Sequence, residues 1–131
     1  MANLFYTYEV NANAIALKLN VEEIWLGLDT AIPCGLIMNE LVLNALKHAF
    51  PEGRTGEVTI QFGVKDTQHL ILSVRDTGVG LPKDLDCRNT DSLGLQLVNA
   101  LTHQIEGIIE ITEDDGIKFE ITFPNKTDLE Q

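Results

Sequence analysis

Residues 36–50 read Leu-Ile-Met-Asn-Glu-Leu-Val-Leu-Asn-Ala-Leu-Lys-His-Ala-Phe, and this stretch decides the fold. Its length and composition predict one helix that ends before Pro51, because proline cannot continue a helix. Most of its residues are apolar, so we expect the helix to be buried on most sides. Its few polar residues include Glu40, Asn44 and Lys47, whose spacing places them on one helical face. That face is either a solvated surface or the wall of a ligand pocket.

The composition indicates one soluble domain with a strong acidic bias. The chain has 131 residues, a net charge of −11 and a sequence pI near 4.5. This charge argues against nucleic acid as a partner, so an anionic ligand has to be held by local donors. No apolar run predicts a membrane span, and no signal segment opens the chain. Cys34 and Cys87 stand far apart and outside any metal-binding pattern, which predicts no zinc site and favours a reducing cytoplasm.

Alternating apolar residues predict strands on both sides of the helix. Residues 15–21 alternate cleanly, and the alternation continues over 24–28 after two glutamates, which predicts a hairpin. Asp29-Thr30 is expected to cap the helix start, with Pro33 in its first turn. Residues 1–13 show no clear pattern and are expected to form an N-terminal tail.

The second half of the chain also contains alternating apolar segments and one segment with helical spacing. Further strands are predicted around Val58–Val64, Leu70–Val74, Ile109–Ile111 and Ile117–Phe123. Leu93, Leu97, Leu101 and Ile105 have helical spacing and predict a helix from Ser92 to about Gln104, ended by Gly107. The order β-β-α-β-β-α-β-β predicts an α/β fold in which helices pack on one face of a mixed sheet.

The segment Asp76-Thr77-Gly78-Val79-Gly80-Leu81-Pro82 follows the third predicted alternation. A carboxylate at the end of an apolar strand needs hydrogen-bond donors, which the amine of a nucleotide base would supply. Read alone, the segment is more typical of a plain Asp-Thr-Gly turn that caps itself by side-chain to backbone hydrogen bonds. Gly78 and Gly80 allow a ligand to approach the backbone closely, although neither a dinucleotide fingerprint nor a P-loop is present.

Ser92-Leu93-Gly94-Leu95 opens the second predicted helix, where free N–H groups favour anions such as phosphate. Ser92 is equally an ordinary N-cap, and the two readings share one geometry. The three histidines, His48, His69 and His103, stand in no catalytic arrangement and are expected to be structural.

Together, residues 39–50, 76–82 and 92–98 resemble the N, G1 and G2 boxes of the GHKL ATP-binding superfamily. The resemblance is strongest to the catalytic domain of sensor histidine kinases, in a subgroup related to HWE kinases. It spans about residues 14–124, so residues 125–131 are expected to be a polar tail. It implies a Bergerat-type two-layer sandwich, with a crossover that departs from the usual right-handed rule.

The resemblance also implies ATP and Mg²⁺ as cofactors and gives each motif residue a role. Asn44 corresponds to the Mg²⁺ ligand, and Glu40 to the residue that holds a metal-bound or attacking water. Lys47, and with it His48, would reach the phosphates. The other implied positions are Asp76 for the adenine amine, Gly78 and Gly80 beside the base, residues 83–91 as a short ATP lid, and Ser92, Leu93, Gly94 and Leu95 at the phosphates.

Two departures from the family pattern bear on activity. The sequence has Gly116-Ile117-Lys118-Phe119 where relatives have Gly-Thr-x-Phe, which predicts weak nucleotide affinity because a threonine hydroxyl is missing. Ser92 stands where many relatives have glycine. No phosphoacceptor histidine box is present, and the dimerisation helices that carry one are expected to precede residue 1.

The resemblance therefore implies the catalytic half of a two-component kinase. It would transfer the γ-phosphoryl group to a histidine on a dimerisation domain absent from this chain, with a response regulator downstream. A first alternative keeps the same pocket and changes the acceptor of the phosphoryl group. The acceptor would be water in a GHKL ATPase or serine in an anti-sigma-type kinase, and Glu40 would then be the general base. A second alternative, motivated by Ile117, is a non-enzymatic interaction domain with a decayed pocket. The isolated domain is expected to be monomeric and to contact no membrane.

Overall fold

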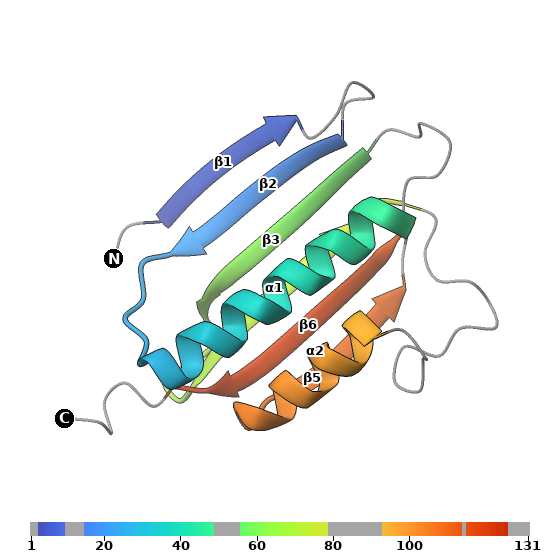
Figure 1. Ribbon diagram of the computed structural model, residues 1–131. Coiled ribbons are helices and arrows are strands. Elements are labelled where there is room, and N and C mark those ends of the chain that lie inside the picture. Colours follow the sequence, from blue (N-terminus) through green and yellow to red (C-terminus); the bar gives the residue numbers. More distant parts are fainter. Residues whose placement is uncertain (1–2, 10–14, 49–55, 79–92, 114, 126–131) are drawn as a thin grey trace.

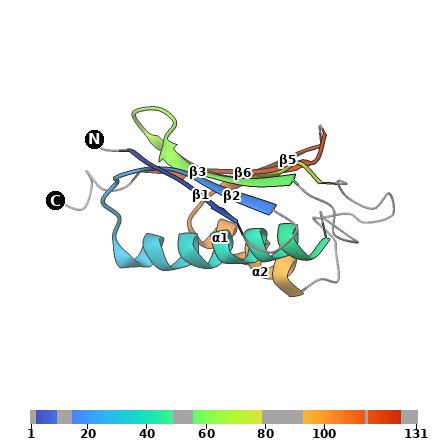
Figure 2. The ribbon, with the colours of Figure 1, turned by 90° about the horizontal axis from the view of Figure 1, so that it is seen from above.

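The computed structural model describes residues 3–9, 15–48, 56–78, 93–113 and 115–125 of the chain. Its elements are β1 (Asn3–Glu9), β2 (Ile15–Glu22), α1 (Leu28–His48), β3 (Gly56–Val64), β4 (His69–Asp76), α2 (Leu93–Gln104), β5 (Ile108–Glu113) and β6 (Ile117–Pro124). Both helices lie against the same face of one sheet (Figures 1 and 2). This arrangement confirms the predicted α/β two-layer sandwich. No helix within these ranges is long and apolar enough to cross a membrane.

The six strands are ordered β1-β2-β3-β4-β6-β5 across the sheet. Only β2 and β3 run parallel, and every other neighbouring pair is antiparallel. The parallel pair is connected through α1. With these strands pointing up and α1 towards the viewer, β3 lies to the left of β2 (Figure 1). This crossover is therefore left-handed, against the general rule, as the family resemblance implied.

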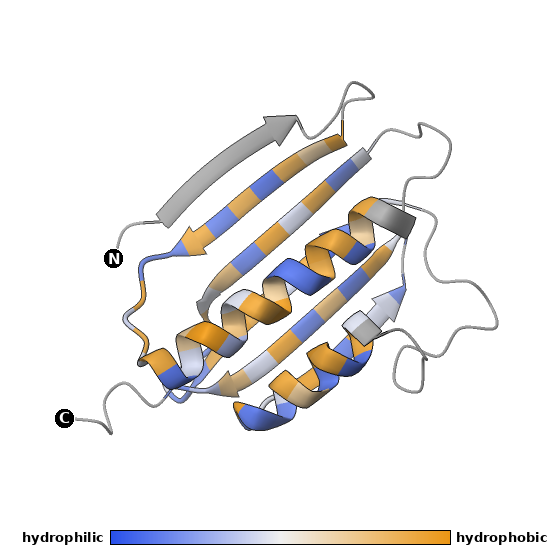
Figure 3. Ribbon diagram, in the orientation of Figure 1, coloured by the Kyte–Doolittle hydropathy of each residue, from blue (hydrophilic) through white to orange (hydrophobic). Residues whose placement is uncertain are grey.

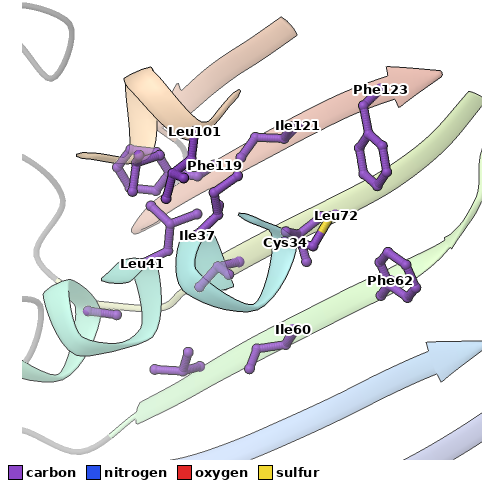
Figure 4. Packing of buried hydrophobic residues seen from close by; sticks show 14 of the residues in the cluster. Cys34, Ile37, Leu41, Ile60, Phe62, Leu72, Leu101, Phe119, Ile121 and Phe123 are labelled. Carbon is purple, nitrogen blue, oxygen red and sulfur yellow. The ribbon is translucent and has the colours of Figure 1, made fainter. Parts of the chain in front are cut away.

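The core forms where the apolar stripes of the helices meet the apolar face of the strands (Figure 3). Ile37 and Leu41 are one turn apart on α1, and each is no more than 1% exposed. They pack near Leu101 of α2 and Phe119 of β6 (Figure 4). Burying each such side chain is worth about 1.5–3 kcal/mol, so this contact fixes how α1 lies on the sheet.

The prediction for the N-terminal part was partly wrong. Residues 3–9, expected in a tail, form β1 and pair antiparallel with β2. No second strand follows β2: residues 23–27 connect it to α1, and Leu28 is already helical. The alternation over 24–28 has no partner strand, because both edges of β2 are already paired with β1 and β3. The predicted order of strands and helices is right, and the strand predicted over 15–21 is present as β2. The strand predicted over 24–28 is absent, and β1 makes up the count in its place.

The start of α1 also differs from the prediction. The carbonyl of Gly27 accepts hydrogen bonds from Thr30 and Ala31, at 3.1 and 2.8 Å, so the helix begins before the expected cap. Asp29 lies within the first turn, where a carboxylate favours the positive end of the helix dipole. Pro33 falls beyond that turn, and the hydrogen bond it cannot donate belongs to the carbonyl of Asp29, which lies at an exposed position.

Helix α2 is present where predicted. Leu101 and Ile105, whose spacing predicted the helix, are buried, whereas Leu97 is 38% exposed. The buried face also includes Leu95 and Val98. The helix ends at Gln104, and Glu106 in the turn that follows has a positive φ of 60°. The N–H of Glu106 donates to His103, and that of Gly107 donates to Thr102 at 2.8 Å, as in a Schellman motif. The left-handed residue is therefore Glu106, and Gly107, which the sequence predicted to end the helix, lies one residue beyond it.

Candidate functional site

The three elements that carry the predicted motifs, β4, α1 and α2, end or begin at the same end of the sheet, where β3 and β6 start. The last residue of β4, Asp76, is opposite Val58 near the start of β3 and opposite Ile117 at the start of β6. The C-terminal end of α1 and the first residue of α2 lie at this end as well (Figures 1 and 2). The topology therefore brings together motifs that are separated in sequence by up to about 50 residues.

Asp76 is the one buried acidic or basic side chain among the described residues, with 3% of the residue exposed. Its register neighbours Val58 and Ile117 are apolar and buried, so they give the carboxylate no polar side-chain partner. This burial raises the pKa of the Asp76 carboxyl above its ordinary value. Two hydrogen bonds partly oppose the shift by stabilising the ionised form.

Both hydrogen bonds reach the same carboxylate oxygen. The N–H of Gly78 donates to Asp76 Oδ1 at 2.9 Å, and the N–H of Ile117 donates to it at 3.4 Å. None of the described residues donates a hydrogen bond to Oδ2. Among the described residues, the carboxylate is therefore held through Oδ1 alone.

The turn between β5 and β6 holds this end of β4 closely. Gly116 has a φ of 126°, a conformation that side chains rarely tolerate. A Cβ atom at this position would overlap the carbonyl oxygen of Asp76 and approach the Cα of Thr77 to 3.0 Å. Glycine is thus required at position 116 by both backbone conformation and contact.

The polar stripe of α1 is only partly accessible. Glu40 and Asn44 are half-buried and lie one turn apart, beside the buried residues Leu41 and Ala45. No hydrogen bond or ion pair joins either polar side chain to another residue in the described part of the chain. Lys47 belongs to the last turn of α1, but its side chain lies outside the described residues, as does that of His48.

The first turn of α2 supplies the other predicted contacts. Leu93 is its first residue, Gly94 is half-exposed, and the Leu95 side chain is buried in the core. The first N–H groups of an α-helix have no partner within the helix, which makes such a turn suited to an anion. Ser92, Gly80 and the predicted lid at 83–91 lie outside the described residues.

Cys34 and His69 lie away from this end of the sheet. Burial raises the pKa of the Cys34 thiol to about 11, so this core residue stays protonated at neutral pH and is a poor nucleophile. His69 Nδ1 lies 3.0 Å from Asp66 in the exposed turn between β3 and β4. The described residues contain no group of three His, Cys, Asp or Glu side chains that would hold a metal ion by themselves.

Two contributions to the site were missed by sequence reasoning. The backbone N–H of Ile117 binds the carboxylate of Asp76, and Gly116 packs against the same residue. Both residues belong to the Gly-Ile-Lys-Phe segment, which the sequence analysis noted. Their contact with Asp76 could not be predicted, because it depends on β6 pairing with β4 as well as with β5.

Comparison with known proteins identifies a matching family. The family model described as "Histidine kinase-, DNA gyrase B-, and HSP90-like ATPase" matches residues 30–127. The chain is 32% identical over 99 residues to Blue-light-activated histidine kinase 2 of Erythrobacter litoralis. The aligned region covers 74% of this chain and 29% of that protein. It is 40% identical over 74 residues to the sensor histidine kinase PdtaS of Mycobacterium tuberculosis, which covers 56% and 15%.

Solved structures agree with this match. The histidine kinase domain of the Erythrobacter litoralis EL346 blue-light activated kinase has a TM-score of 0.77 and 29% identity, over 81% of this chain and 49% of that one. The Acinetobacter baumannii histidine kinase AdeS shares the fold, with a TM-score of 0.67 and 20% identity over 82% and 53%. The chain therefore spans less than a third of the curated relatives named above.

Proposed function

The chain belongs to the histidine kinase-, DNA gyrase B- and HSP90-like ATPase family, and from this premise we propose that it binds Mg-ATP as the catalytic domain of a sensor histidine kinase. The acceptor of the γ-phosphoryl group would be a histidine on a phosphoacceptor and dimerisation domain outside residues 14–124. A response regulator would then take the phosphoryl group. The relatives described above, which are histidine kinases, support this assignment.

The observation that carries the proposal is the arrangement around Asp76. A buried carboxylate whose Oδ1 already accepts two N–H groups can accept one further donor only on its other oxygen. The exocyclic amine of adenine is such a donor, whereas guanine presents a carbonyl at the same position, which would leave the carboxylate unpaired. Gly78, which is buried against this carboxylate, and Gly80 would let the base approach the backbone.

The residues of α1 and α2 fit the phosphate end of the nucleotide. The carboxamide oxygen of Asn44 is a hard ligand of the kind that Mg²⁺ accepts, and one protein oxygen suffices when phosphates and waters complete the shell. Mg²⁺, when bound, would neutralise charge on the phosphates. Glu40, one turn earlier, would accept a proton or hold a water, and Lys47 with His48 would offer positive charge. The Ser92-Leu93-Gly94-Leu95 turn would hold phosphate through backbone N–H groups.

The direct test is calorimetric titration of the chain with a non-hydrolysable ATP analogue, with and without Mg²⁺. We expect binding that strengthens when Mg²⁺ is present, because Asn44 can contribute to affinity only through the ion. The same titration with the GTP analogue should give at least tenfold weaker binding, since the N–H groups at Oδ1 leave no donor for a guanine carbonyl. Equal affinity for both bases would contradict the assignment of Asp76 as the base-reading residue.

Ile117 gives a prediction about how tightly the nucleotide is held. Its side chain is buried on the same sheet face as Asp76, in the position where relatives carry threonine. Ile117→Thr is expected to tighten binding of the ATP analogue about tenfold, the worth of one added hydrogen bond, while reducing stability by about 2 kcal/mol through lost apolar burial. Calorimetry and denaturant unfolding would measure the two effects.

The matched control is Ile117→Val, which has the shape of threonine without its hydroxyl. Val should lower stability less than Thr, by about 0.5–1.5 kcal/mol, and leave affinity unchanged. If Thr and Val bind the analogue alike, the missing hydroxyl does not limit affinity, and the low-affinity expectation drawn from the sequence is wrong.

A further inference from the structure

Thr77, the residue after Asp76, closes the β3–β4 ladder in an irregular way. Its N–H donates to the carbonyl of Glu57 at 3.0 Å, as expected for the next antiparallel pair beyond Val58 and Asp76. In a regular pair the N–H of Glu57 would return a bond to the backbone carbonyl of Thr77. Here it donates to Thr77 Oγ1 instead, also at 3.0 Å. The side-chain hydroxyl thus takes the place of a backbone carbonyl.

Because the Thr77 hydroxyl accepts this hydrogen bond in place of the Thr77 carbonyl, the chain can leave the sheet directly after Asp76 and still keep the last pair of hydrogen bonds. The carbonyl of Thr77 is released from the ladder, so the backbone can turn towards Gly78, whose N–H donates to Asp76 Oδ1. The N–H of Glu57 remains bonded, which avoids an unpaired donor at the strand end. A carbonyl acceptor at position 77 would instead extend β4 and carry Gly78 away from the carboxylate.

Asp76 is consequently held on two sides of its backbone. On the following residue, two hydrogen bonds join Thr77 to Glu57 of β3. On its own carbonyl, Gly116 of the β5–β6 turn packs so closely that no Cβ would fit. Since the side chain is also bonded through Oδ1, the direction of its free oxygen depends on where Thr77 places the backbone.

We infer that Thr77 is a positioning residue for base recognition: its hydroxyl, bonded to the N–H of Glu57, fixes Asp76 so that Oδ2 meets the amine of the base. This inference rests on the proposed nucleotide site and adds a residue to it that does not itself touch the ligand. Small misplacements of a hydrogen-bonding group weaken recognition strongly, because the geometry of a charge-assisted bond is narrow.

The test compares two nucleotides that differ only in the 6-amino group, ATP and purine riboside triphosphate. Their affinity ratio, measured by calorimetry with Mg²⁺, reports the amine contact and is unaffected by a general loss of stability. Thr77→Val keeps the shape of the side chain and removes the acceptor, so we expect the ratio to fall about tenfold. Thr77→Ser keeps the hydroxyl and should preserve the ratio within about twofold.

Two controls separate positioning from other effects. Glu57→Gln removes the exposed ion pair between Lys18 and Glu57 but keeps the N–H that binds Thr77, so it should leave the ratio unchanged. Thermal unfolding without nucleotide records the structural effect of each variant separately. Thr77 is exposed, so Thr77→Val is expected to fold, and Thr77→Ala removes the same acceptor with less bulk if it does not.

The outcomes are distinct. A lower melting temperature with an unchanged nucleotide ratio in Thr77→Val would overturn the inference and leave Thr77 a purely structural residue. A reduced ratio restored by Thr77→Ser supports it. Failure of the wild-type chain to bind either nucleotide would instead overturn the proposed function on which the inference rests.

Discussion

Asp76→Asn is expected to weaken binding of a non-hydrolysable ATP analogue by about 100-fold and, at the same time, to raise the stability of the nucleotide-free chain at neutral pH. The loss of affinity arises because asparagine can keep the N–H bonds of Gly78 and Ile117 on its oxygen only by turning its NH₂ group towards the base. Two donors would then face each other. Calorimetric titration and thermal unfolding measure the two effects.

The gain in stability follows from the raised pKa of Asp76. Burial raises this pKa in the folded state, so between the unfolded and folded pKa values the unfolded chain releases the proton first. Stability is therefore fully present below the unfolded pKa and is lost as the pH rises through the folded pKa. Above the folded pKa the wild-type chain carries the penalty of a buried charge, and asparagine removes it. The advantage of the variant should vanish below the ordinary pKa of an aspartate.

Asp66→Asn is the matched control, because the pKa of this exposed carboxyl is shifted in the opposite direction. Hydrogen bonds from the backbone N–H of Gln68 and from the side chain of His69 lower the pKa of Asp66. The ionised carboxylate therefore stabilises the folded state at pH values above the unfolded pKa. The control should lower stability slightly at neutral pH and leave nucleotide affinity unchanged. If Asp76→Asn also destabilises the chain at neutral pH, or binds the analogue as the wild type does, the proposed role of the buried carboxylate is wrong.

Much of the site could be predicted because its parts are local. The composition of residues 36–50 predicts a helix, and helical geometry places Glu40 and Asn44 on one face of it. The Asp-Thr-Gly segment marks the end of β4, because alternation stops there. The family resemblance then joined these parts into one site and implied the left-handed crossover, which no residue spacing predicts.

The parts that could not be predicted are those that depend on strand order. Asp76 meets Ile117 only because β6 inserts between β4 and β5, whereas the sequence suggests just a β5–β6 hairpin. Likewise, the apolar residues of α2 fit two helical faces, and packing against the sheet selected the one containing Leu95 and Val98. The aromatic-rich β1 was overlooked since its pairing with β2 involves no motif.

Glu40→Gln addresses the chemistry rather than the binding. The side chain is half-buried on α1, one turn before Asn44, and in the proposed site its carboxylate would accept a proton or hold a water. Removing its charge is expected to reduce phosphoryl transfer by about 10²–10⁴-fold, the usual contribution of a general base. Affinity for the ATP analogue should change by no more than about threefold, because glutamine keeps the size and an oxygen of the side chain.

The acceptor is identified in the same experiment, using ATP labelled on the γ-phosphate and a phosphoacceptor domain supplied separately. Acid-labile label on that domain is the product expected of a histidine kinase, acid-stable label indicates serine, and released inorganic phosphate indicates water.

Asp29→Asn is the control for Glu40→Gln, since it removes one negative charge from the opposite end of α1 and should leave the rate unaltered. If the rate survives Glu40→Gln, then catalysis relies on positioning by Asn44 and the phosphate-binding turn, and the general-base assignment fails. Such a result would be consistent with a loose transition state, for which an enzyme supplies alignment and charge more than proton transfer.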